Sequence, residues 1–487
     1  METKHAYLRK TLALALATVM VFAMAACGDS PSGGDNPPVG GEVADTIFNN
    51  DIVACTGKDP VLKESVRDLK GKTIKFATFW QDWDGTNRGI ESIQQQELNA
   101  AAIKSIEADY NCKIEIVLMS SKTYLSDIAT ARSAGIVYAN VFQLQKEMDP
   151  LYRSGSVADL SRVQSVGLTT NEWNPAITAM TTYKGKVFGL GVNQNRLMYD
   201  VVFFNKTMAQ KYNLGNFYDL VRNNEWTHEK FLDLNEQVSK ASNRKVFGTV
   251  GCYTCSLKDL IYSNKTLPIL NKDGVVTFNG TSNDNLKMLN YIQEFPKNGY
   301  YYNTAMNMYD HVADTVTASE SAFEQGKSLF YITSAWMATN FSKKMKDEYG
   351  ILPLPKGPDA DSYINLITNS RYMSLFDGDP DIEDSGAIMV ALINRTNMKI
   401  ADWEDSQLST LCDEDSLEML QTIQQSPVVI TGDQHMEDPT DGPANNYDMD
   451  YWTNAINDIL RGSKTPKQAM DAIVNPVQAL LDDMFND

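Results

Sequence analysis

The chain has 487 residues, of which 43% are apolar and 22% charged, and its formal charge is −19. This length allows two or three domains, and the composition is ordinary for a globular protein that buries a sizeable core. The acidity argues against a nucleic-acid partner, because phosphate binding needs a basic face.

The first residues indicate export. A basic start, "METKHAYLRK", is followed by an apolar run that ends in small residues before Cys27. This pattern is typical of a secretory signal, and the run is too short for a membrane span. Residues 24–27, "MAAC", resemble the bacterial lipoprotein signal, with Met24 where leucine is usual. We therefore expect residues 1–26 to be removed and Cys27 to carry lipid; the alternative is ordinary cleavage beside a chance cysteine.

A polar stretch rich in Gly, Pro, Ser and Asp follows Cys27. It is too polar to collapse, so we expect residues 27–45 to be a flexible linker between lipid and folded body. The folded protein is then expected to begin between residues 45 and 70. It would be anchored to the outer face of the cytoplasmic membrane.

Five further cysteines follow the expected lipid attachment site, at positions 55, 112, 252, 255 and 412. An odd number in an exported chain cannot pair completely within the chain. The C-x-x-C of Cys252 and Cys255 has no second pair or neighbouring histidine that would support zinc, and no helix opens at it as in a redox site. A local disulfide and two free thiols both remain open.

From residue 72 the pattern alternates between strand and helix. Strands are expected at 72–79, 112–119 and 136–144, and helices at 88–110 and 124–135, the second stopped by Gly135. This order predicts a parallel sheet with right-handed crossovers. Ligands of such open sheets bind outside the carboxyl ends of the strands, and the loop "WQDWDG" follows the first strand.

A second α/β unit is expected from about residue 200. It is expected to begin with a strand and helix at 201–214, a helix at 225–242 with Thr227 as N-cap, and a strand at 245–251. A hairpin at 270–280 turning at Asp273-Gly274 and a helix from 282 ended by Pro296 are expected next. A strand between Gly326 and Trp336 and an extended segment at 349–358 follow, and the last eighty residues are expected to be mainly helical. We expect the acidic tract 433–450 to be solvated surface.

Several segments together resemble the extracellular solute-binding proteins of ABC importers, in the branch that includes maltose-binding protein. They occur in the family's order between about residues 72 and 485: "ELNAAAIKSIEADYNCKIEIVLM", "SAGIVYANVFQL", "SGSVADLS", "YKGKVFGLGVNQNRLMYDVVFFNK", "FEQGKSLFYITSAWM" and "YGILPLPKGP". Departures are Asn140 for the usual Asp, Phe204 for the Tyr of "YNK", and Gly191 for a Pro.

The resemblance implies a two-lobed periplasmic-binding-protein fold, each lobe a mainly parallel sheet with flanking helices, hinged by crossing strands. Lobe I would comprise residues 72–193 and 355–400, and lobe II residues 195–354 and 401–487. The chain would cross near 193–196 and return near 355–371. The resemblance further implies a monomer without catalytic activity or cofactor, which captures a small solute between the lobes and delivers it to the membrane subunits of an ABC permease.

The loop "WQDWDG" offers both chemistries that a sugar requires. Trp80 and Trp83 supply planes for apolar C–H faces, while Asp82 and Asp84 accept hydrogen bonds from hydroxyls. The alternatives are that both indole rings pack under the lobe and that Asp84 caps the next helix.

Six further candidates for ligand binding lie elsewhere in the chain. Trp336 has the position of the family's cleft tryptophan, and Tyr253 lies in a loop that lines the cleft in relatives. The others are Gln143 after the third strand, Asn193 and Asn195 at the first crossing, and Arg371 near the return crossing. Arg371 could equally serve as a structural ion-pair partner, and Trp336 could belong to the core.

Rival functions remain. Acidic residues are plentiful enough for a lipid-anchored glycoside hydrolase, although no G-x-S-x-G motif occurs. The same fold could bind a peptide, polyamine or metal ion instead of a sugar. The four histidines, His5, His228, His311 and His435, lack metal-ligand spacing, so no metal site is expected. The tract 433–450 lacks an EF-hand pattern, and cation binding there stays open.

Overall fold

The computed structural model divides into two compact units, Met1–Val39 and Gly40–Asp487. The structure describes residues 61–79, 93–120, 123–145, 148–192, 199–251, 257–272, 274–303, 319–366, 371–429, 431–436 and 450–486, all of the second unit. The expected signal, the lipidated Cys27 and the linker therefore lie outside the described residues. Within the described part, no helix is both long and apolar enough to cross a membrane.

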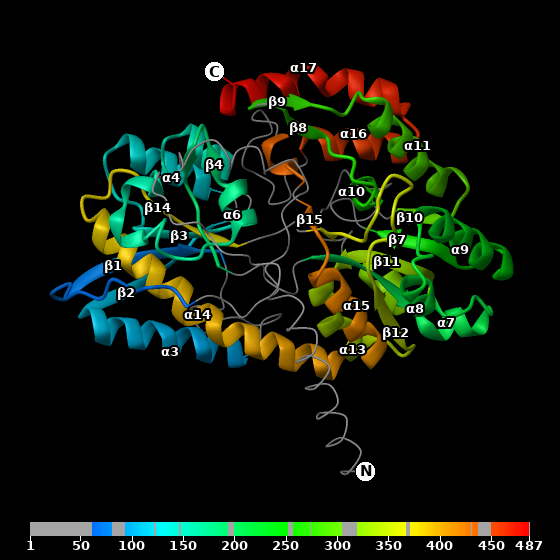
Figure 1. Ribbon diagram of the computed structural model, residues 1–487, viewed down its shortest axis with the longest axis horizontal. Helices are drawn as coiled ribbons and strands as arrows, with labels where there is room; N and C mark the ends of the chain where they lie inside the picture. The colour runs from blue at the N-terminus through cyan, green and yellow to red at the C-terminus, as the bar shows by residue number, and fades with distance from the viewer. Residues whose placement is uncertain are drawn as a thin grey trace, which may run out of the picture. The chain divides into compact units, whose positions relative to one another are not determined.

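The first sheet has the strand order β14-β3-β1-β2 (Figure 1). Its strands are β1 (Lys72–Thr78), β2 (Cys112–Leu118), β3 (Val141–Leu144) and β14 (Tyr372–Leu375). The pairs β1–β2 and β1–β3 are parallel, as the sequence predicts, whereas β14 is antiparallel to β3. The third strand begins at Val141, later than expected. Just before it, the Asn140 side chain accepts a hydrogen bond from the Lys75 backbone N–H.

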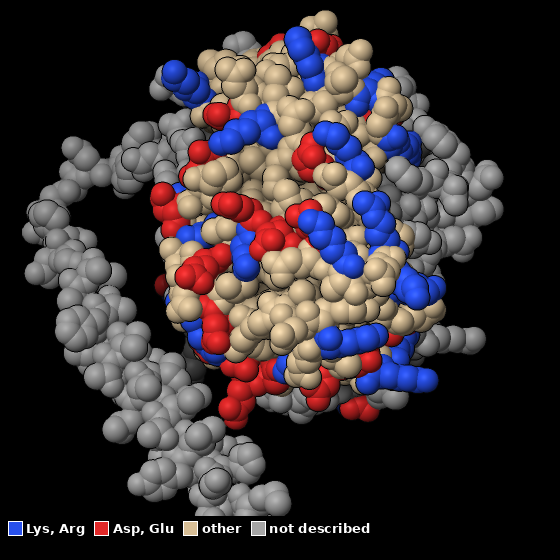
Figure 2. Space-filling model, turned by 90° about the vertical axis from the view of Figure 1, so that its right-hand side faces the viewer, with Lys and Arg blue, Asp and Glu red and all other residues tan. Residues whose placement is uncertain are grey.

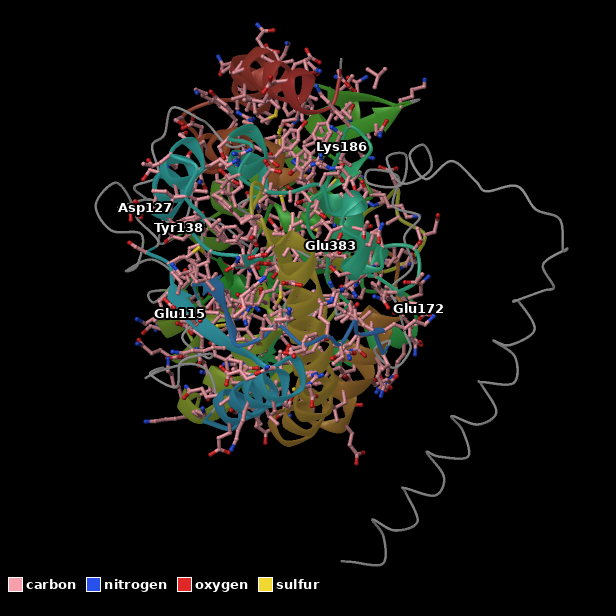
Figure 3. All side chains as sticks on the ribbon, turned by 90° about the vertical axis from the view of Figure 1, so that its left-hand side faces the viewer. Glu115, Asp127, Tyr138, Glu172, Lys186 and Glu383 are labelled. Carbon is pink, nitrogen blue, oxygen red and sulfur yellow. The ribbon has the colours of Figure 1, made fainter. Side chains whose placement is uncertain are left out.

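Helices cover this sheet because each presents apolar residues to it. They are α3 (Ile93–Tyr110), α4 (Tyr124–Ser133), α5 (Met148–Arg153), α6 (Pro175–Met180) and the long α14 (Ile382–Leu411), with the short hairpin β4 (Thr182–Tyr183) and β5 (Lys186–Val187). The buried core includes Phe76, Val141 and Ile388. Glu383, in the first turn of α14, accepts backbone hydrogen bonds from Gln164 and Ser165 (Figure 3).

The second sheet has the order β10-β7-β11-β6-β12. Its strands are β6 (Asp200–Asn205), β7 (Phe247–Gly251), β10 (Tyr301–Asn303), β11 (Ser328–Ser334) and β12 (Tyr349–Leu352). Strands β10, β7 and β11 are parallel, and β6 pairs antiparallel with both β11 and β12. Four strands therefore share one direction and β6 alone opposes it, which makes this sheet mainly parallel in direction.

The elements around the second sheet agree largely with the sequence. They are α7 (Lys206–Lys211), α8 (Phe217–Arg222), α9 (His228–Ala241), α10 (Asp259–Tyr262), the hairpin β8 (Ile269–Lys272) and β9 (Val275–Phe278), α11 (Asn283–Lys297), α13 (Ala338–Lys344), α15 (Glu414–Gln424), α16 (Tyr451–Leu460) and α17 (Pro466–Met484). Thr227 caps α9 by accepting the Lys230 N–H, as predicted. Asp273 of the predicted hairpin turn lies outside the described residues.

Two expectations need correction. Helix α11 continues past Pro296 to Lys297, so the proline, which cannot donate a hydrogen bond to the Ile292 carbonyl, does not end the helix at its own position. The tract 433–450 is not solvated at its ends, because Asp433 and Asp450 are largely buried, with side-chain exposures of 13% for Asp433 and 9% for the Asp450 residue. Asp433 pairs with the Lys258 ammonium at 2.8 Å, which compensates its burial. Residues 437–449 lie outside the described residues.

Residues 61–69, which precede β1 in the sequence, bind along α14, and we call this segment the strap. The Leu62 N–H donates to Asn394 Oδ1 at 3.0 Å, and the Leu62 side chain is buried. Glu64 accepts from Arg395 Nε at 3.0 Å and from Asn394 Nδ2 at 2.7 Å. The Glu64 and Arg395 side chains are only 12% and 17% exposed. The strap thus joins the start of the folded chain to the helix that follows β14.

We predict that Arg395→Met destabilises the protein by about 2–4 kcal/mol, because it leaves the Glu64 carboxylate largely buried without its guanidinium. Urea unfolding followed by circular dichroism measures this. The matched control is Lys467→Met, which removes the exposed Lys467–Asp471 pair and should cost less than about 0.5 kcal/mol. Equal losses in the two variants would show that the strap pair contributes no more than a surface pair.

Candidate functional site

The carboxyl ends of the first sheet's parallel strands meet at one edge. Strand β1 ends at Thr78, whose hydroxyl donates to Gln143 Oε1 at 3.0 Å. Gln143 lies near the end of β3 and is buried, with 8% of its surface exposed. The predicted "WQDWDG" residues, 80–85, follow Phe79 directly in the sequence and lie outside the described residues.

Strand β14 brings Arg371 to the same edge from the opposite direction. In the register of β14 with β3, Met373 lies opposite Gln143 and Tyr372 opposite Leu144. Arg371 directly precedes this pairing and is partly buried. Two predicted residues that are 228 positions apart in sequence are therefore neighbours along one sheet edge.

The chain that leaves the first sheet rises to this edge as well. Leu190 and Met373 exchange both backbone hydrogen bonds at 2.9 Å, so residues 189–192 run antiparallel to β14. This segment therefore approaches the carboxyl edge as it proceeds. A Cβ at Gly191 would lie 2.8 Å from Ile177 Cδ1, so a larger residue here would require the end of that side chain to shift. Asn193 and Asn195 come next and lie outside the described residues.

An equivalent edge exists on the second sheet. Strand β11 ends at Ser334, whose hydroxyl donates to the buried Asp200 Oδ1 at 2.7 Å. The Ala335 N–H donates to the Tyr199 carbonyl at 3.0 Å. Trp336 follows, partly exposed, with one part of its side chain packed against the core that contains Tyr199 and Phe341. An aromatic surface thus stands at the carboxyl end of β11.

The short connection between the two edges limits how far apart they can lie. Val192 leaves the first edge and Asp200 enters the second, eight residue steps later. A fully extended chain spans at most about 3.6 Å per residue, so these residues lie within about 29 Å of each other.

The structure thus describes three predicted site residues, Gln143, Trp336 and Arg371, all at carboxyl edges. Gln143 and Arg371 share the first edge, and Trp336 lies on the second. The other seven predicted positions lie outside the described residues: Trp80, Asp82, Trp83, Asp84, Asn193, Asn195 and Tyr253. So do Cys252 and Cys255, hence their disulfide stays a prediction. Cys112 and Cys412 are free thiols.

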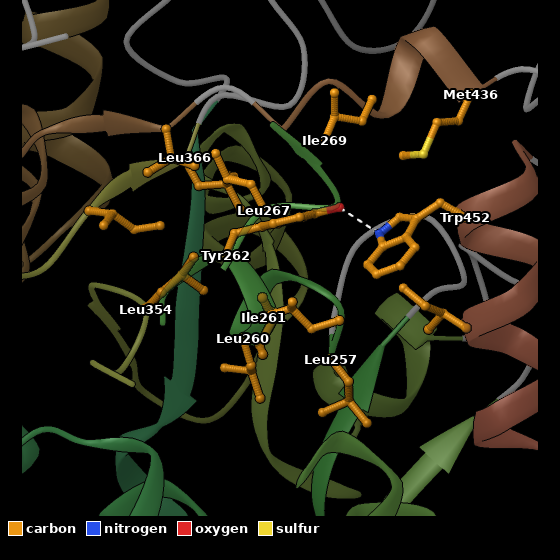
Figure 4. Packing of buried hydrophobic residues seen from close by; sticks show 14 of the residues in the cluster. Leu257, Leu260, Ile261, Tyr262, Leu267, Ile269, Leu354, Leu366, Met436 and Trp452 are labelled. Atoms are coloured by element: carbon orange, nitrogen blue, oxygen red, sulfur yellow. Dashed lines mark hydrogen bonds between the residues drawn. The ribbon is translucent and has the colours of Figure 1, made fainter. Parts of the chain in front are cut away.

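Sequence reasoning missed a buried polar cluster at the start of α10. Lys258 Nζ contacts Asp433 Oδ2 at 2.8 Å, and the Tyr262 hydroxyl donates to Asp433 Oδ1 at 2.6 Å. The Trp452 indole N–H donates to the Tyr262 hydroxyl at 2.9 Å (Figure 4). The signal in the sequence is faint: a Lys-Asp pair inside the apolar run "SLKDLIY".

Burial and charge act against each other in this cluster. Burial disfavours the Lys258 cation, but the surrounding carboxylates outweigh it and raise the lysine pKa. Burial also raises the pKa of Asp450. Lys258 is five positions after Tyr253 in the sequence, and the cluster connects α10 to η6 (Asp433–Met436) through Asp433.

The family of the chain is shown by comparison with known proteins. Residues 101–405, more than half of the chain, match the family described as bacterial extracellular solute-binding protein. The chain belongs to this family. Members of this exported family are solute-binding proteins, which agrees with the resemblance seen in the sequence. No curated protein matches the chain.

Solved structures with the same two-lobed α/β fold cover most of this solute-binding protein. The GacH receptor of Streptomyces glaucescens, studied unliganded and with acarbose, has 13% identity and a TM-score of 0.57 over 85% of this chain and 99% of its own. A Thermotoga lettingae ABC-transporter solute-binding protein with α-D-tagatose has 16% identity and a TM-score of 0.56 over 84% and 100%. UgpB of Mycobacterium tuberculosis, with glycerophosphocholine, has 12% identity and a TM-score of 0.57 over 84% and 98%.

The charged surface of this solute-binding protein is mixed. The face in Figure 2 has Lys and Arg side chains interspersed with Asp and Glu, without one broad basic area. Among the described residues, no group of three or more His, Cys, Asp or Glu side chains could hold a metal ion.

Two of the four histidines are described, and both are buried with partners. His228 Nε2 lies 2.8 Å from the Ser263 hydroxyl, and its ring stacks on Tyr291 with a centroid distance of 4.8 Å. Burial lowers the pKa of His228 to about 3. His435 contacts Asp149. His228 is therefore a neutral core residue of this solute-binding protein.

We predict that His228 makes the protein less stable as pH falls from about 6.5 to about 3. In this range of pH, His228 binds a proton in the unfolded state but not in the folded state. Its contribution to the free energy of unfolding is therefore complete above pH 6.5 and is lost on acidification. The loss is up to about 5 kcal/mol. The difference in unfolding free energy between wild type and His228→Gln, measured at several pH values, isolates this histidine from the carboxylates. A difference independent of pH would contradict the neutral assignment.

Proposed function

We propose that this chain is the lipid-anchored substrate-binding component of an ABC importer, that it captures a mono- or oligosaccharide between its two lobes, and that it is not an enzyme. The observation that carries the proposal is the kind of side chain found at the carboxyl edge of each sheet. Gln143 and Arg371 offer planar polar groups on the first, and Trp336 offers an aromatic plane on the second. Sugars present hydroxyl edges and apolar faces that match both.

The connections support binding between the lobes. Chain length keeps the two edges within about 29 Å of each other along the first crossing. A solute that contacts both edges prefers the arrangement in which the edges approach, so it would shift the lobes toward closure. We infer that lobe I comprises residues 72–193 and 355–400 and lobe II residues 195–354 and 401–487.

Sugar is favoured over the alternative solutes by the partly exposed Trp336 and by the tryptophans expected at residues 80 and 83. The fold alone does not decide which class of solute is bound, since one similar protein was solved with glycerophosphocholine and another with tagatose. Specificity would come from paired hydrogen bonds, because an unpaired polar group in a closed site costs about 1–3 kcal/mol.

The first test is a thermal-shift screen of mono- and oligosaccharides, with peptides and polyamines as competing classes. If a solute binds specifically, the melting temperature rises as the concentration of that solute is increased. The folded state is stabilised by about 2.7 kcal/mol when the solute is present at one hundred times its dissociation constant. Stabilisation by peptides or polyamines but by no sugar would contradict the carbohydrate assignment. Release of product from an oligosaccharide would favour a hydrolase instead.

The second test concerns the aromatic planes. Trp336→Ala should weaken the binding of the stabilising sugar at least about tenfold, since a stacked aromatic surface is lost. The matched variant Trp336→Phe retains a ring and should stay within about threefold of wild type. Isothermal titration calorimetry gives both values. The variants Trp80→Ala and Trp83→Ala should likewise affect binding more than folding; normal binding by both would remove that loop from the site.

A further inference from the structure

An acidic residue that sequence reasoning missed lies beside the carboxyl edge of the second sheet. Strands β7 and β11 are parallel neighbours in this sheet (Figure 1). Strand β7 ends at Gly251, whose carbonyl accepts a hydrogen bond from the Ser319 hydroxyl at 3.0 Å. Ser319 is buried, and residues 319–324 are helical. Glu320 follows Ser319 directly and is partly exposed, so this acidic residue stands next to the end of β7.

The side chain of Asn340 holds the Glu320 carboxylate. Asn340 Nδ2 donates to Glu320 Oε1 at 2.8 Å, and both residues are partly exposed. Asn340 belongs to α13, which continues directly from the short helix η5 (Ala335–Met337). Trp336 of η5 is four positions before Asn340, and side chains at this spacing lie on one face of a helix. Glu320, Asn340 and Trp336 therefore lie together at the second edge, and we call them the edge group.

The edge group keeps hydrogen-bonding atoms for a solute. In the part of the chain that the structure describes, Glu320 Oε2 accepts no hydrogen bond, and neither Asn340 Oδ1 nor Trp336 Nε1 has a partner. Two acceptors, one donor and an aromatic plane are therefore available at one place. The carboxylate oxygen is the strongest of these acceptors, because hydrogen bonds to a charged group are stronger than those between neutral groups.

One helical turn further on, the same two segments meet through a different pair. Lys344 Nζ lies 3.2 Å from Glu324 Oε1, and the Glu324 side chain is only 16% exposed. These residues follow Asn340 and Glu320 by four positions each, so the two contacts are successive turns of one helix packing. A lysine neutralises the carboxylate of Glu324, whereas an amide faces that of Glu320 and, among the described residues, no cation does. The negative charge of Glu320 is therefore available to a solute.

We propose that Glu320 binds the solute and selects sugars with unmodified hydroxyl groups over sugars that carry an acidic group. The proposal rests on the proposed function and deepens it. A sugar ring whose apolar face stacks on the indole of Trp336 directs its hydroxyls outward from the edge of the ring. Glu320 Oε2 and Asn340 Oδ1 can then accept hydrogen bonds from two of these hydroxyls.

A solute with an acidic substituent meets a like charge at the same place. Like charges a few ångströms apart repel, and the partial burial of the edge group reduces the screening of this repulsion by water. A uronate or a sugar phosphate would therefore bind more weakly than its parent sugar. Asn340 acts as a positioning residue as well, because its amide keeps the Glu320 carboxylate in one orientation.

The test compares Glu320→Gln with wild type in full-length protein by isothermal titration calorimetry. The probes are maltose, glucose and galactose, the uronates of glucose and galactose, and spermidine. Glutamine keeps the shape of the side chain and still accepts from Asn340 Nδ2, so the fold should be preserved, which circular dichroism checks. Glu320→Gln should bind the neutral sugars about tenfold more weakly than wild type. The matched control Glu324→Gln should leave the affinity for these sugars unchanged, because that carboxylate pairs with Lys344.

The uronates give the second readout. Wild type should bind each uronate at least about tenfold more weakly than its parent sugar, and Glu320→Gln should narrow this difference to about threefold or less. Asn340→Ala should weaken the binding of the neutral sugars about threefold, because the carboxylate is no longer held, while the uronates remain excluded. A residue that only supports the fold would change the affinities for both classes of sugar equally.

Two results would overturn the proposal while the carbohydrate assignment stands. One is an unchanged affinity of Glu320→Gln for a neutral sugar that wild type binds, and the other is a uronate that binds wild type as tightly as its parent sugar. Binding of spermidine that is lost in Glu320→Gln, without binding of any sugar, would overturn both and assign the carboxylate to a cationic solute. Absence of binding by all of the probes would contradict both as well.

Discussion

Strand direction is the constraint on which this structure depends. Parallel strands must all end at the same edge of their sheet, so the loops that follow them gather there. The two strands that oppose their sheets, β14 and β6, are those that enter after a crossing. Each of these two strands begins at the carboxyl edge of its sheet and therefore runs antiparallel to the strands that end at that edge. The reversed strands thus place Arg371 and Asp200 beside the ends of β3 and β11.

Much of this arrangement can be predicted from the sequence. The spacing of apolar residues switches between that of a strand and that of a helix, which predicts β1, α3, β2 and α4. The preference of threonine for the start of a helix predicts the Thr227 cap. The rule for open sheets places Gln143 at a ligand-binding edge from the order of strands and helices alone. Trp336 and Arg371 require the family resemblance, because no local pattern marks which strand end or crossing faces a solute.

The buried polar contacts could not be predicted, since their partners are far apart in sequence. Arg395 and Glu64 are separated by 331 residues, and His435 and Asp149 by 286. One acid among several in the tract 433–450 is indistinguishable in sequence from solvated surface, which is why the prediction for the ends of this tract is wrong. Only tertiary packing brings Lys258 to Asp433 and offsets the cost of burying that acid. Charge pairing, not composition, decides which acidic residues face water.

Contact of one solute with the carboxyl edges of both sheets at once is the central claim. Hydrogen exchange measured by mass spectrometry, with and without a saturating sugar, tests it most directly. We predict slower exchange in two separate regions, residues 141–145 with 371–375 on the first sheet and residues 331–337 on the second. Protection confined to one sheet, or absent from both while the sugar is bound, would contradict the claim.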